Sequence, residues 1–298
     1  MILLDHHFLL PTKHTPFSIF PFACVHEDNP GHSASKWQEF LCEVKTTKHA
    51  LAIGLGDYMD WLRTHARDFL KLYPNETDHS FRQLHDYRRK AADLFCEKYL
   101  DGIRDKLVGL SLGNHHHDFG DGLNDVMYMC QQLKVPYLGK GFFIRLNCYE
   151  ADRATFKSLR IYGHHGEGVG GGATMGGDVN AMENKGKGVV ADIYLMAHNH
   201  KKHGFHTEPI TIPRRGKLSI VSEPKAFIRA GCFVKGYIEN CVSYAEAKQM
   251  NPTAIGYVRL DVKFKEPYNK EAYQEAKSRG AKNPTRVGQL QYEFKVTY

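Results

Sequence analysis

Histidines stand in three tight groups along this chain of 298 residues. The groups lie at 115–117, at 164–165 and at 198–203, and each follows a run of apolar residues. Neutral imidazole is the commonest protein ligand for transition metals. A single histidine is usually a core or surface residue, but three such groups are difficult to explain by packing. The grouping therefore indicates a metal site.

Further polar residues follow the short apolar segments that are typical of buried strands. These segments cover 17–25, 49–55, 106–112, 158–163 and 191–197. The polar residues at or just after their carboxyl ends are Cys24, His26, Asp57, Asp60, Asn114, His115, His164, His198 and His200. In an open α/β sheet, ligands bind outside the carboxyl ends of the strands. We therefore expect these side chains to converge on one crevice.

The residue types in these groups suit a pair of divalent cations. Two cations ~3.5–4 Å apart need a bridging carboxylate and several imidazole or amide ligands, and they then hold a hydroxide and bind phosphate oxygens. A mixed set of nitrogen and oxygen ligands favours Mn, Fe, Zn or Ni over Mg or Ca. The pattern therefore predicts metal-dependent hydrolysis of a phosphate ester.

The order of these groups resembles the calcineurin-like metallophosphoesterase family. That family has the motifs D-x-H, G-D-x-x-D, G-N-H-[DE], a single His after a strand, and G-H-x-H. The corresponding residues here are Cys24-Val25-His26, GDYMD at 56–60, GNHH at 113–116, His164 and Ala197-His198-Asn199-His200. The resemblance covers about residues 17–205. It implies an α/β fold, a four-layer sandwich of two mixed β-sheets flanked by helices.

The resemblance also implies a role for each matching residue. Asp57 would be the bridging carboxylate, and Asp60 would orient a ligand histidine or His115. His115 would be the catalytic histidine, which stabilises or protonates the leaving group. The metal ligands would be His26 and His200 for one cation, and Asn114, His164 and His198 for the other. Of the two adjacent histidines His164 and His165, His164 is favoured as the ligand because family members place the ligand directly after the strand.

Three departures from the family pattern affect these expectations. Cys24 stands where the family has an acid; its thiolate would favour softer ions such as Zn or Fe, or Cys24 is a small buried residue that leaves one cation a ligand short. An alternative D-x-H begins at Asp5, but its spacing to Asp57 is long. His116 replaces the acid after the catalytic histidine, and Ala197 replaces a glycine, which should be tolerated.

Competing motifs fit less well. Glycines at 166, 168 and 171 match G-x-G-x-x-G, but no acidic residue ends a second strand ~20 positions further on. We interpret this segment as a flexible loop on the substrate side. The run HNHKKH at 198–203 resembles the metal motif of metallo-β-lactamase-like hydrolases, but Lys202 stands where that motif has Asp.

The remaining pattern predicts one metallophosphoesterase domain over 1–298, with a core at about 17–264. Helices are expected at 35–45, 59–106, 121–133 and 175–187, and part of the second, about 61–106, is an insert. Strands are also expected at 142–148, 217–223, 255–264 and 289–298. The polar, lysine-rich segment at about 265–298 is expected to be a peripheral excursion that ends in the last of these strands.

The substrate is less well defined by the sequence. The formal charge is +7, and basic residues at 82, 88–90, 185, 187 and 214–215 could contact a nucleic-acid backbone or could simply be solvated. A phosphodiester in nucleic acid (DNA or RNA) or in a nucleotide is the favoured substrate, with Mn the favoured metal. The alternatives are a phosphomonoesterase and a catalytically impaired scaffold of the same fold. No organic cofactor is implied.

Signals for export or membrane insertion were also considered. The first residues carry no basic region and no small-residue cleavage site, and no apolar run reaches the length of a membrane span. The seven cysteines form no C-x-x-C pair, which is typical of reduced thiols. We therefore expect a cytoplasmic protein without a membrane partner.

Overall fold

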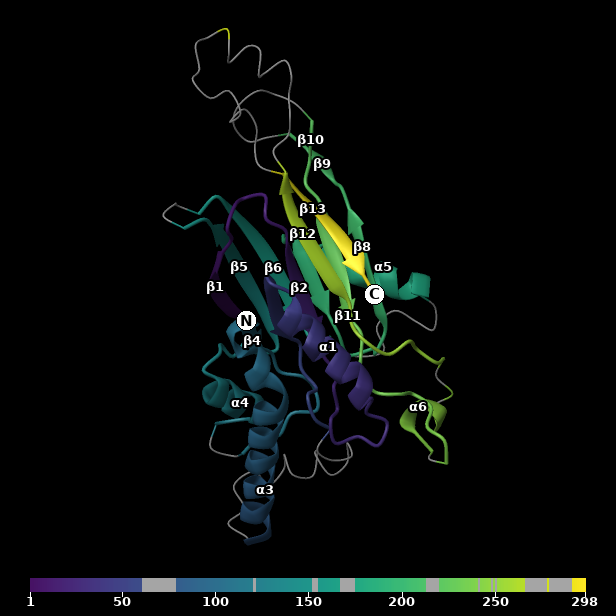
Figure 1. Ribbon diagram of the computed structural model, residues 1–298. Helices are drawn as coiled ribbons and strands as arrows, with labels where there is room; N and C mark the ends of the chain where they lie inside the picture. The colour runs from purple at the N-terminus through teal and green to yellow at the C-terminus, as the bar shows by residue number, and fades with distance from the viewer. Residues whose placement is uncertain are drawn as a thin grey trace.

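The computed structural model describes residues 1–60, 79–119, 122–151, 155–166, 175–212, 220–240, 242–247, 249, 251–265, 278 and 291–298. Two mixed β-sheets form the centre of the molecule, and helices lie on their outer faces (Figure 1). The predicted fold class, two mixed sheets flanked by helices, is confirmed.

The smaller sheet has five strands in the order β13-β12-β2-β3-β4. Its parallel part consists of β2 (Phe17–Phe22), β3 (Ala50–Gly54) and β4 (Leu107–Leu110). Strands β12 (Arg259–Lys265) and β13 (Gln291–Thr297) are antiparallel to their neighbours. The parallel strands are buried throughout and almost entirely apolar because both faces of the sheet are covered.

The larger sheet has six strands in the order β1-β5-β6-β7-β11-β8. Strands β6 (Lys157–His164), β7 (Ile193–Met196) and β11 (Lys225–Ala230) are mutually parallel. The flanking strands are β1 (Ile2–Leu9), β5 (Gly141–Tyr149) and β8 (Lys202–Thr207). A separate short hairpin joins β9 (Ile210–Thr211) to β10 (Val221–Ser222).

The main hydrophobic core lies between the two sheets. Ile19 and Val262 of the smaller sheet pack in one buried cluster with Ile144, Ile161 and Leu195 of the larger sheet. All five side chains are essentially inaccessible to water. Burial of apolar surface contributes a free energy of about 25 cal/mol per Å². This stabilisation holds the two sheets face to face and fixes the positions of their strand ends.

Helices add a layer outside each sheet. The smaller sheet is covered by α1 (Ala34–Thr46), α4 (Asp125–Leu133) and α3 (His79–Phe95), which continues into η1 (Cys96–Leu100) and η2 (Asp101–Lys106). The larger sheet is covered by α5 (Met175–Gly186), whose Met182 packs on Tyr194 and Phe227. A one-turn helix, α6 (Tyr244–Ala247), follows β11 along the chain (Figure 1).

Two strands fall outside the core range expected from the sequence. Strand β1 pairs in parallel with β5, and β13 pairs with β12, so both belong to the central sheets. Part of the expected insert (61–78) and most of the expected excursion (266–277 and 279–290) lie outside the described residues. The single-domain assignment remains a prediction.

Two further expectations concern the chain as a whole. No helix within the described ranges is long and apolar enough to cross a membrane. Six cysteines of these ranges, all except Cys42 buried, are free thiols.

Candidate metal centre

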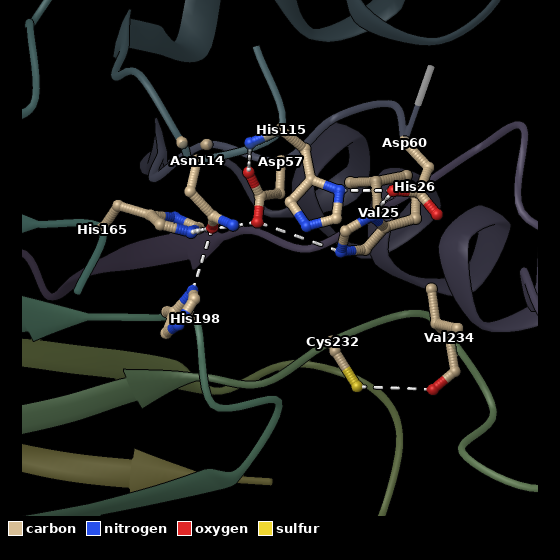
Figure 2. A network of polar contacts seen from close by, with 12 residues as sticks. Val25, His26, Asp57, Asp60, Asn114, His115, His165, His198, Cys232 and Val234 are labelled. Carbon is tan, nitrogen blue, oxygen red and sulfur yellow. Dashed lines mark hydrogen bonds and ion pairs between the residues drawn. The ribbon is translucent and has the colours of Figure 1, made fainter. Parts of the chain in front are cut away.

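The carboxyl ends of five parallel strands bring the expected residues together. Strands β2, β3 and β4 lead into the segments of His26, Asp57 and Asn114, while β6 and β7 lead into those of His165 and His198. Figure 2 shows these side chains pointing toward one another across the gap between the two sheets. The convergence expected from the sequence is therefore present in the fold.

Asp57 lies at the centre of this arrangement. Its side chain is buried, with 4% of the residue exposed. Carboxylate oxygen Oδ1 accepts a hydrogen bond from the backbone N–H of His115 at 2.9 Å. The other oxygen, Oδ2, lies 3.0 Å from Nε2 of His165 and 4.0 Å from Nε2 of His26. One carboxylate thus faces imidazoles from both sheets.

Two glycines permit this close packing around Asp57. Gly56 has φ +98°, and a Cβ on it would lie 2.4 Å from the backbone nitrogen of Gly113. A Cβ on Gly113 would lie 2.0 Å from Oδ1 of Asp57 and 2.4 Å from its backbone nitrogen. The glycines of the G-D and G-N motifs therefore allow the loops after β3 and β4 to approach within backbone contact.

His26 and His200 form one side of the centre, with ring centroids 5.3 Å apart. Both ring nitrogens of His26 are buried and make no hydrogen bond with any residue in the described part of the chain. Buried polar nitrogens normally have a partner. A cation bound beside His26 would satisfy this unmet requirement, so the residues fit a metal.

Cys24 lies beside His26 and His200 and also close to Asp57. The ligand atoms of Cys24, His26 and His200 all lie within 4.8 Å of one another, and so do those of Cys24, Asp57 and His165. Cys24 is completely buried, and burial raises the pKa of its thiol well above the usual range. The sulfur is therefore placed between the two groups of ligands, where a bound cation would favour the thiolate.

Asn114, His165 and His198 form the other side. Oδ1 of Asn114 is 2.9 Å from Nε2 of His165 and 2.9 Å from Nδ1 of His198. The carbonyl oxygen of Leu55 lies 2.5 Å from Nδ1 of His165, so this backbone oxygen fixes the ring and directs Nε2 toward Asp57. A backbone carbonyl on the second nitrogen is the usual support for a metal-binding histidine.

The structure replaces His164 by His165 in this group. His164 is the last residue of β6, and its Nδ1 accepts a hydrogen bond from the backbone N–H of Gly166 at 2.8 Å. Successive side chains of a strand point to opposite faces. Leu159, Ile161 and His165 therefore share the face toward the intersheet core, whereas His164 lies on the other face. The structure therefore places His165, and not the expected His164, beside Asp57 and Asn114.

His115 and Asp60 lie beside His26, at the edge of the centre. Nδ1 of His115 contacts Oδ1 of Asp60, while Nδ2 of Asn29 donates to the other oxygen of Asp60 at 3.0 Å. Asp60 therefore contacts His115, and its expected function of orienting that ring remains a prediction. The ring of His115 is also close to that of His26, with centroids 4.8 Å apart.

Other residues considered from the sequence lie elsewhere. Asp5 is on the edge strand β1, where its carboxylate pairs with Arg145. His116 contacts the carbonyl oxygen of Gly113 and lies 3.5 Å from Asp118. Asp5 therefore does not supply the missing acid of the first motif. The ring of His116 contacts the backbone of Gly113 and does not take the place of the acid that would follow the catalytic histidine.

Burial and neighbouring charges shift the pKa values of the groups at the centre. Burial lowers the pKa of His26 to about 3 and that of His200 to about 4, so both are neutral near pH 7. Burial would raise the pKa of Asp57, but His165 and other histidines outweigh it and hold that pKa well below its usual range. Burial likewise opposes protonation of His165, but the Asp57 carboxylate outweighs it and raises the pKa of that imidazole.

Backbone strain is concentrated at the centre. Of the eight non-glycine residues with positive φ in the described part of the chain, five are Cys24 (50°), His26 (43°), Asp57 (56°), His198 (73°) and His200 (59°). Such conformations cost roughly 1–3 kcal/mol each and persist where the surrounding structure enforces them. The fold therefore directs these side chains at the expense of local backbone energy.

Comparisons with known proteins give matches among solved structures. No protein-family model and no curated protein matches the sequence. A predicted phosphoesterase from Streptococcus pneumoniae is 12% identical, with a TM-score of 0.32, over 85% of this chain and 86% of that one. Vps29 from Entamoeba histolytica in complex with zinc is 11% identical, with a TM-score of 0.37, over 94% and 99%.

A third similar structure is a putative 5′-nucleotidase from Staphylococcus aureus in complex with α-ketoglutarate. It is 11% identical, with a TM-score of 0.38, and the match covers 95% of this chain but 54% of that one.

Proposed function

We propose that this chain is a metal-dependent phosphoesterase that hydrolyses a phosphodiester. The observation that carries the proposal is the position of Asp57, whose one carboxylate oxygen faces His165 at 3.0 Å and His26 at 4.0 Å. A shared carboxylate between two groups of imidazoles is what a pair of divalent cations requires.

The ligand groups assign residues to each cation. His26, His200 and Cys24 would hold one, and Asn114, His165 and His198 the other, with Asp57 shared between them. When bound, the cations lower the pKa of water and neutralise charge on the phosphate. Mn remains the first choice for the nitrogen and oxygen ligands, while the Cys24 sulfur would favour Zn or Fe at its position.

His115 would transfer the proton to the leaving group. Its Nδ1 contacts Asp60, so the proton would pass from Nε2 to the ester oxygen as the P–O bond breaks. Water supplies the oxygen that joins phosphorus, and the proton that water loses balances the one that the alcohol gains. Asp60 would keep the imidazole oriented.

The proposed substrate is nucleic acid or a nucleotide. Of the basic residues considered, Arg82 and Lys90 of α3 are exposed and could contact phosphates. Arg88 is buried, with 1% exposed, so it is not available to a DNA or RNA backbone. Residues 214–215 lie outside the described part of the chain.

The test compares hydrolysis of bis-p-nitrophenyl phosphate with that of p-nitrophenyl phosphate in the presence of Mn²⁺. We expect diester cleavage that requires metal and falls about 10²–10⁴-fold in His115→Ala. His206→Ala is the matched control, because His206 is an exposed histidine of β8 outside the centre and should leave the rate unchanged.

Two other outcomes would replace the proposal. Preference for the monoester would make the protein a phosphomonoesterase. Absence of hydrolysis of either ester with any divalent metal would favour the non-catalytic scaffold. The cysteine at position 24, where the resembled family has an acid, would then be the first candidate cause.

A further inference from the structure

The loop after β7 carries two of the proposed ligands in an unfavourable backbone conformation. His198 has φ 73° and His200 has φ 59°, with Asn199 between them. Both imidazoles must keep these orientations to face Asn114 and His26. Something outside the ligand set must therefore hold the loop.

A buried polar cluster lies directly behind this loop. We use the name Asp178 cluster for Asp178, Asn199, His203 and Arg229, which come from α5, the loop, β8 and β11 respectively. None of the four was assigned a role from the sequence. The cluster thus joins three elements of the larger sheet layer to the segment that carries His198 and His200.

Asp178 makes contact with every other member of the cluster. Its Oδ1 accepts hydrogen bonds from Nδ2 of Asn199 at 2.6 Å and from Nη2 of Arg229 at 3.0 Å. Its Oδ2 lies 2.5 Å from Nε2 of His203. Arg229 then donates through Nη1 to the carbonyl oxygen of Ala197 at 2.9 Å. The loop is therefore held at Ala197 and at Asn199, on both sides of His198.

The burial of these charges argues for a specific requirement. Asp178 is completely buried and Arg229 is 2% exposed. Replacing a buried ion pair by apolar side chains is often neutral or stabilising, so such a pair is weak evidence for stability alone. A buried pair that fixes one strained loop is better explained by the geometry that it imposes on that loop.

We propose that Asp178 is a positioning residue for the metal centre, which keeps His198 and His200 directed at the cations by anchoring Asn199 and, through Arg229, Ala197. The inference rests on the proposed function, in which these two histidines bind metal. Asp178 itself touches neither of them. Residues that support metal ligands from behind typically change metal affinity 10–100-fold when they are replaced.

The physical step is a relaxation of the loop. Asp178→Asn would replace one acceptor oxygen by an NH₂ group, which can only donate. This donor would face another donor, the N–H of His203, Asn199 or Arg229. At least one hydrogen bond and the ion pair would be lost. His198 and His200 could then leave the left-handed region, and their nitrogens would no longer point to common positions.

The experiment measures metal binding to the full chain by isothermal titration calorimetry with Zn²⁺. We expect Asp178→Asn to bind Zn²⁺ about 10–100-fold more weakly than the wild type. The visible absorption spectrum with Co²⁺ should also change, because that spectrum reports coordination geometry rather than stability. Circular dichroism and the melting temperature establish that the variant is folded.

Asp192→Asn is the matched control. Asp192 is also a buried acid, 7% exposed, and it also pairs with an arginine, Arg160, but it lies at the opposite end of β7. This variant should lose comparable stability and keep wild-type Zn²⁺ affinity and Co²⁺ spectrum. Equal weakening in Asp178→Asn and Asp192→Asn would overturn the inference, because the effect would then be a general loss of stability.

Further outcomes separate this inference from the proposed function. A folded Asp178→Asn with affinity within about two-fold of the wild type would overturn the inference, given the usual effect of such residues. If that variant does not fold, Asn199→Ala removes only the loop side of the contact, and unchanged affinity there would overturn it equally. Wild-type protein that binds no divalent cation would instead refute the proposed function.

Discussion

His26 has the environment that most directly identifies a metal ligand. The side chain is 3% exposed and lies in the left-handed region of the backbone, and both ring nitrogens are without a hydrogen bond among the described residues. A core histidine held for packing would be expected to find at least one partner. The fold thus maintains a neutral imidazole in a strained position with its nitrogens available to a cation.

The distinction between His165 and His164 leads to a first prediction. His165→Ala should remove one of two bound cations, because His165 faces both Asp57 and Asn114. His164→Ala should retain both, since His164 contacts Gly166 on the other face of the strand. Metal content after dialysis, measured by mass spectrometry, checks this. Loss of metal in His164→Ala alone would contradict the site described above.

The pair His164 and His165 also shows which site residues motif matching can identify. The motif order located eight of the polar residues of the site, but the position after the strand did not decide between His164 and His165. The alternation in S-L-R-I-Y-G-H-H would have decided it, because Leu159 and Ile161 are the inward-facing apolar residues and His165 continues that series. At this position strand periodicity is therefore a better guide than family spacing.

A second prediction concerns Cys24. Its sulfur lies within 4.8 Å of ligand atoms on both sides of the centre, and a thiolate favours softer ions. Cys24→Asp should therefore shift the preference from Zn²⁺ toward Mn²⁺ by about tenfold or more, as harder oxygen ligands do. Competition titrations with the two metals measure the shift. An unchanged preference in Cys24→Asp and in Cys24→Ser would mean that the sulfur is not a ligand.

At the scale of elements, the loops after β3 and β4 lock together. The third prediction is that Gly113→Ala lowers the free energy of unfolding by about 1–3 kcal/mol, as overpacking does, because the new Cβ would lie 2.0 Å from Oδ1 of Asp57. Gly102→Ala is the control, since a Cβ there meets nothing within 4 Å. Urea denaturation measures both. Equal stability of the two variants would show that the loops are less tightly apposed than described.

Local sequence signals predicted most elements but not all of the pairing. The helix expected at 121–133 begins at Asp125 because Asn124 caps it, with its side-chain oxygen accepting from the backbone N–H of Met127 at 2.8 Å. Strand β1 was not predicted, since its pairing partner β5 is more than 130 residues away and its sequence, ILLDHHFL, does not alternate between apolar and polar residues. Long-range pairing of this kind leaves little trace in a local window.

At the scale of the whole molecule, contacts across the layers hold the strand ends in place. Asp192, just before β7, accepts hydrogen bonds from Arg160 of the neighbouring strand at 2.7 Å and 2.8 Å. It also accepts one from the hydroxyl of Tyr292 at 2.9 Å, and Tyr292 belongs to β13 in the other sheet. This carboxylate therefore links the two sheets at the end opposite to the metal centre.

The fourth prediction is a pH dependence from Asp192. Burial alone would raise the pKa of this carboxyl, but the hydrogen bonds from Arg160 outweigh it and lower the pKa. Since an unfolded Asp has a pKa of about 3.9, the stabilisation is present above that value and is lost as the pH falls through the lower folded pKa. Asp192→Asn should cost about 1–3 kcal/mol at neutral pH.

The same reasoning defines how this prediction is checked. The difference in free energy of unfolding between the wild type and Asp192→Asn should become smaller as the pH falls below about 4. The unfolded carboxyl protonates there first, and the folded carboxyl follows at its lower pKa. Denaturation at a series of pH values measures the difference. A difference that stays constant down to about pH 2 would mean that Asp192 does not titrate differently in the two states.

The overall architecture followed from the sequence to the extent that apolar runs and motif order define it. The alternation of strands and helices in the first half, and the polar residues at five strand ends, predicted an α/β fold and one crevice. The two mixed sheets were implied only by the resemblance of the motif order to a known family. The Asp178 cluster was not predicted, because Asp178 and Arg229 are 51 residues apart and meet only when α5 packs beside β11. Buried pairs that form across layers have no local pattern.

The most direct test of the account is the metal content of the wild-type protein and of Asp57→Asn, measured after loading with Mn²⁺ or Zn²⁺ and dialysis. The shared position of Asp57 predicts about two equivalents of metal per chain in the wild type, as a two-cation centre requires, and loss of both in the variant. His206→Ala should bind as the wild type does. A wild type that holds no metal, or an Asp57→Asn variant that holds as much as the wild type, would contradict the central claim that one carboxylate organises two cations.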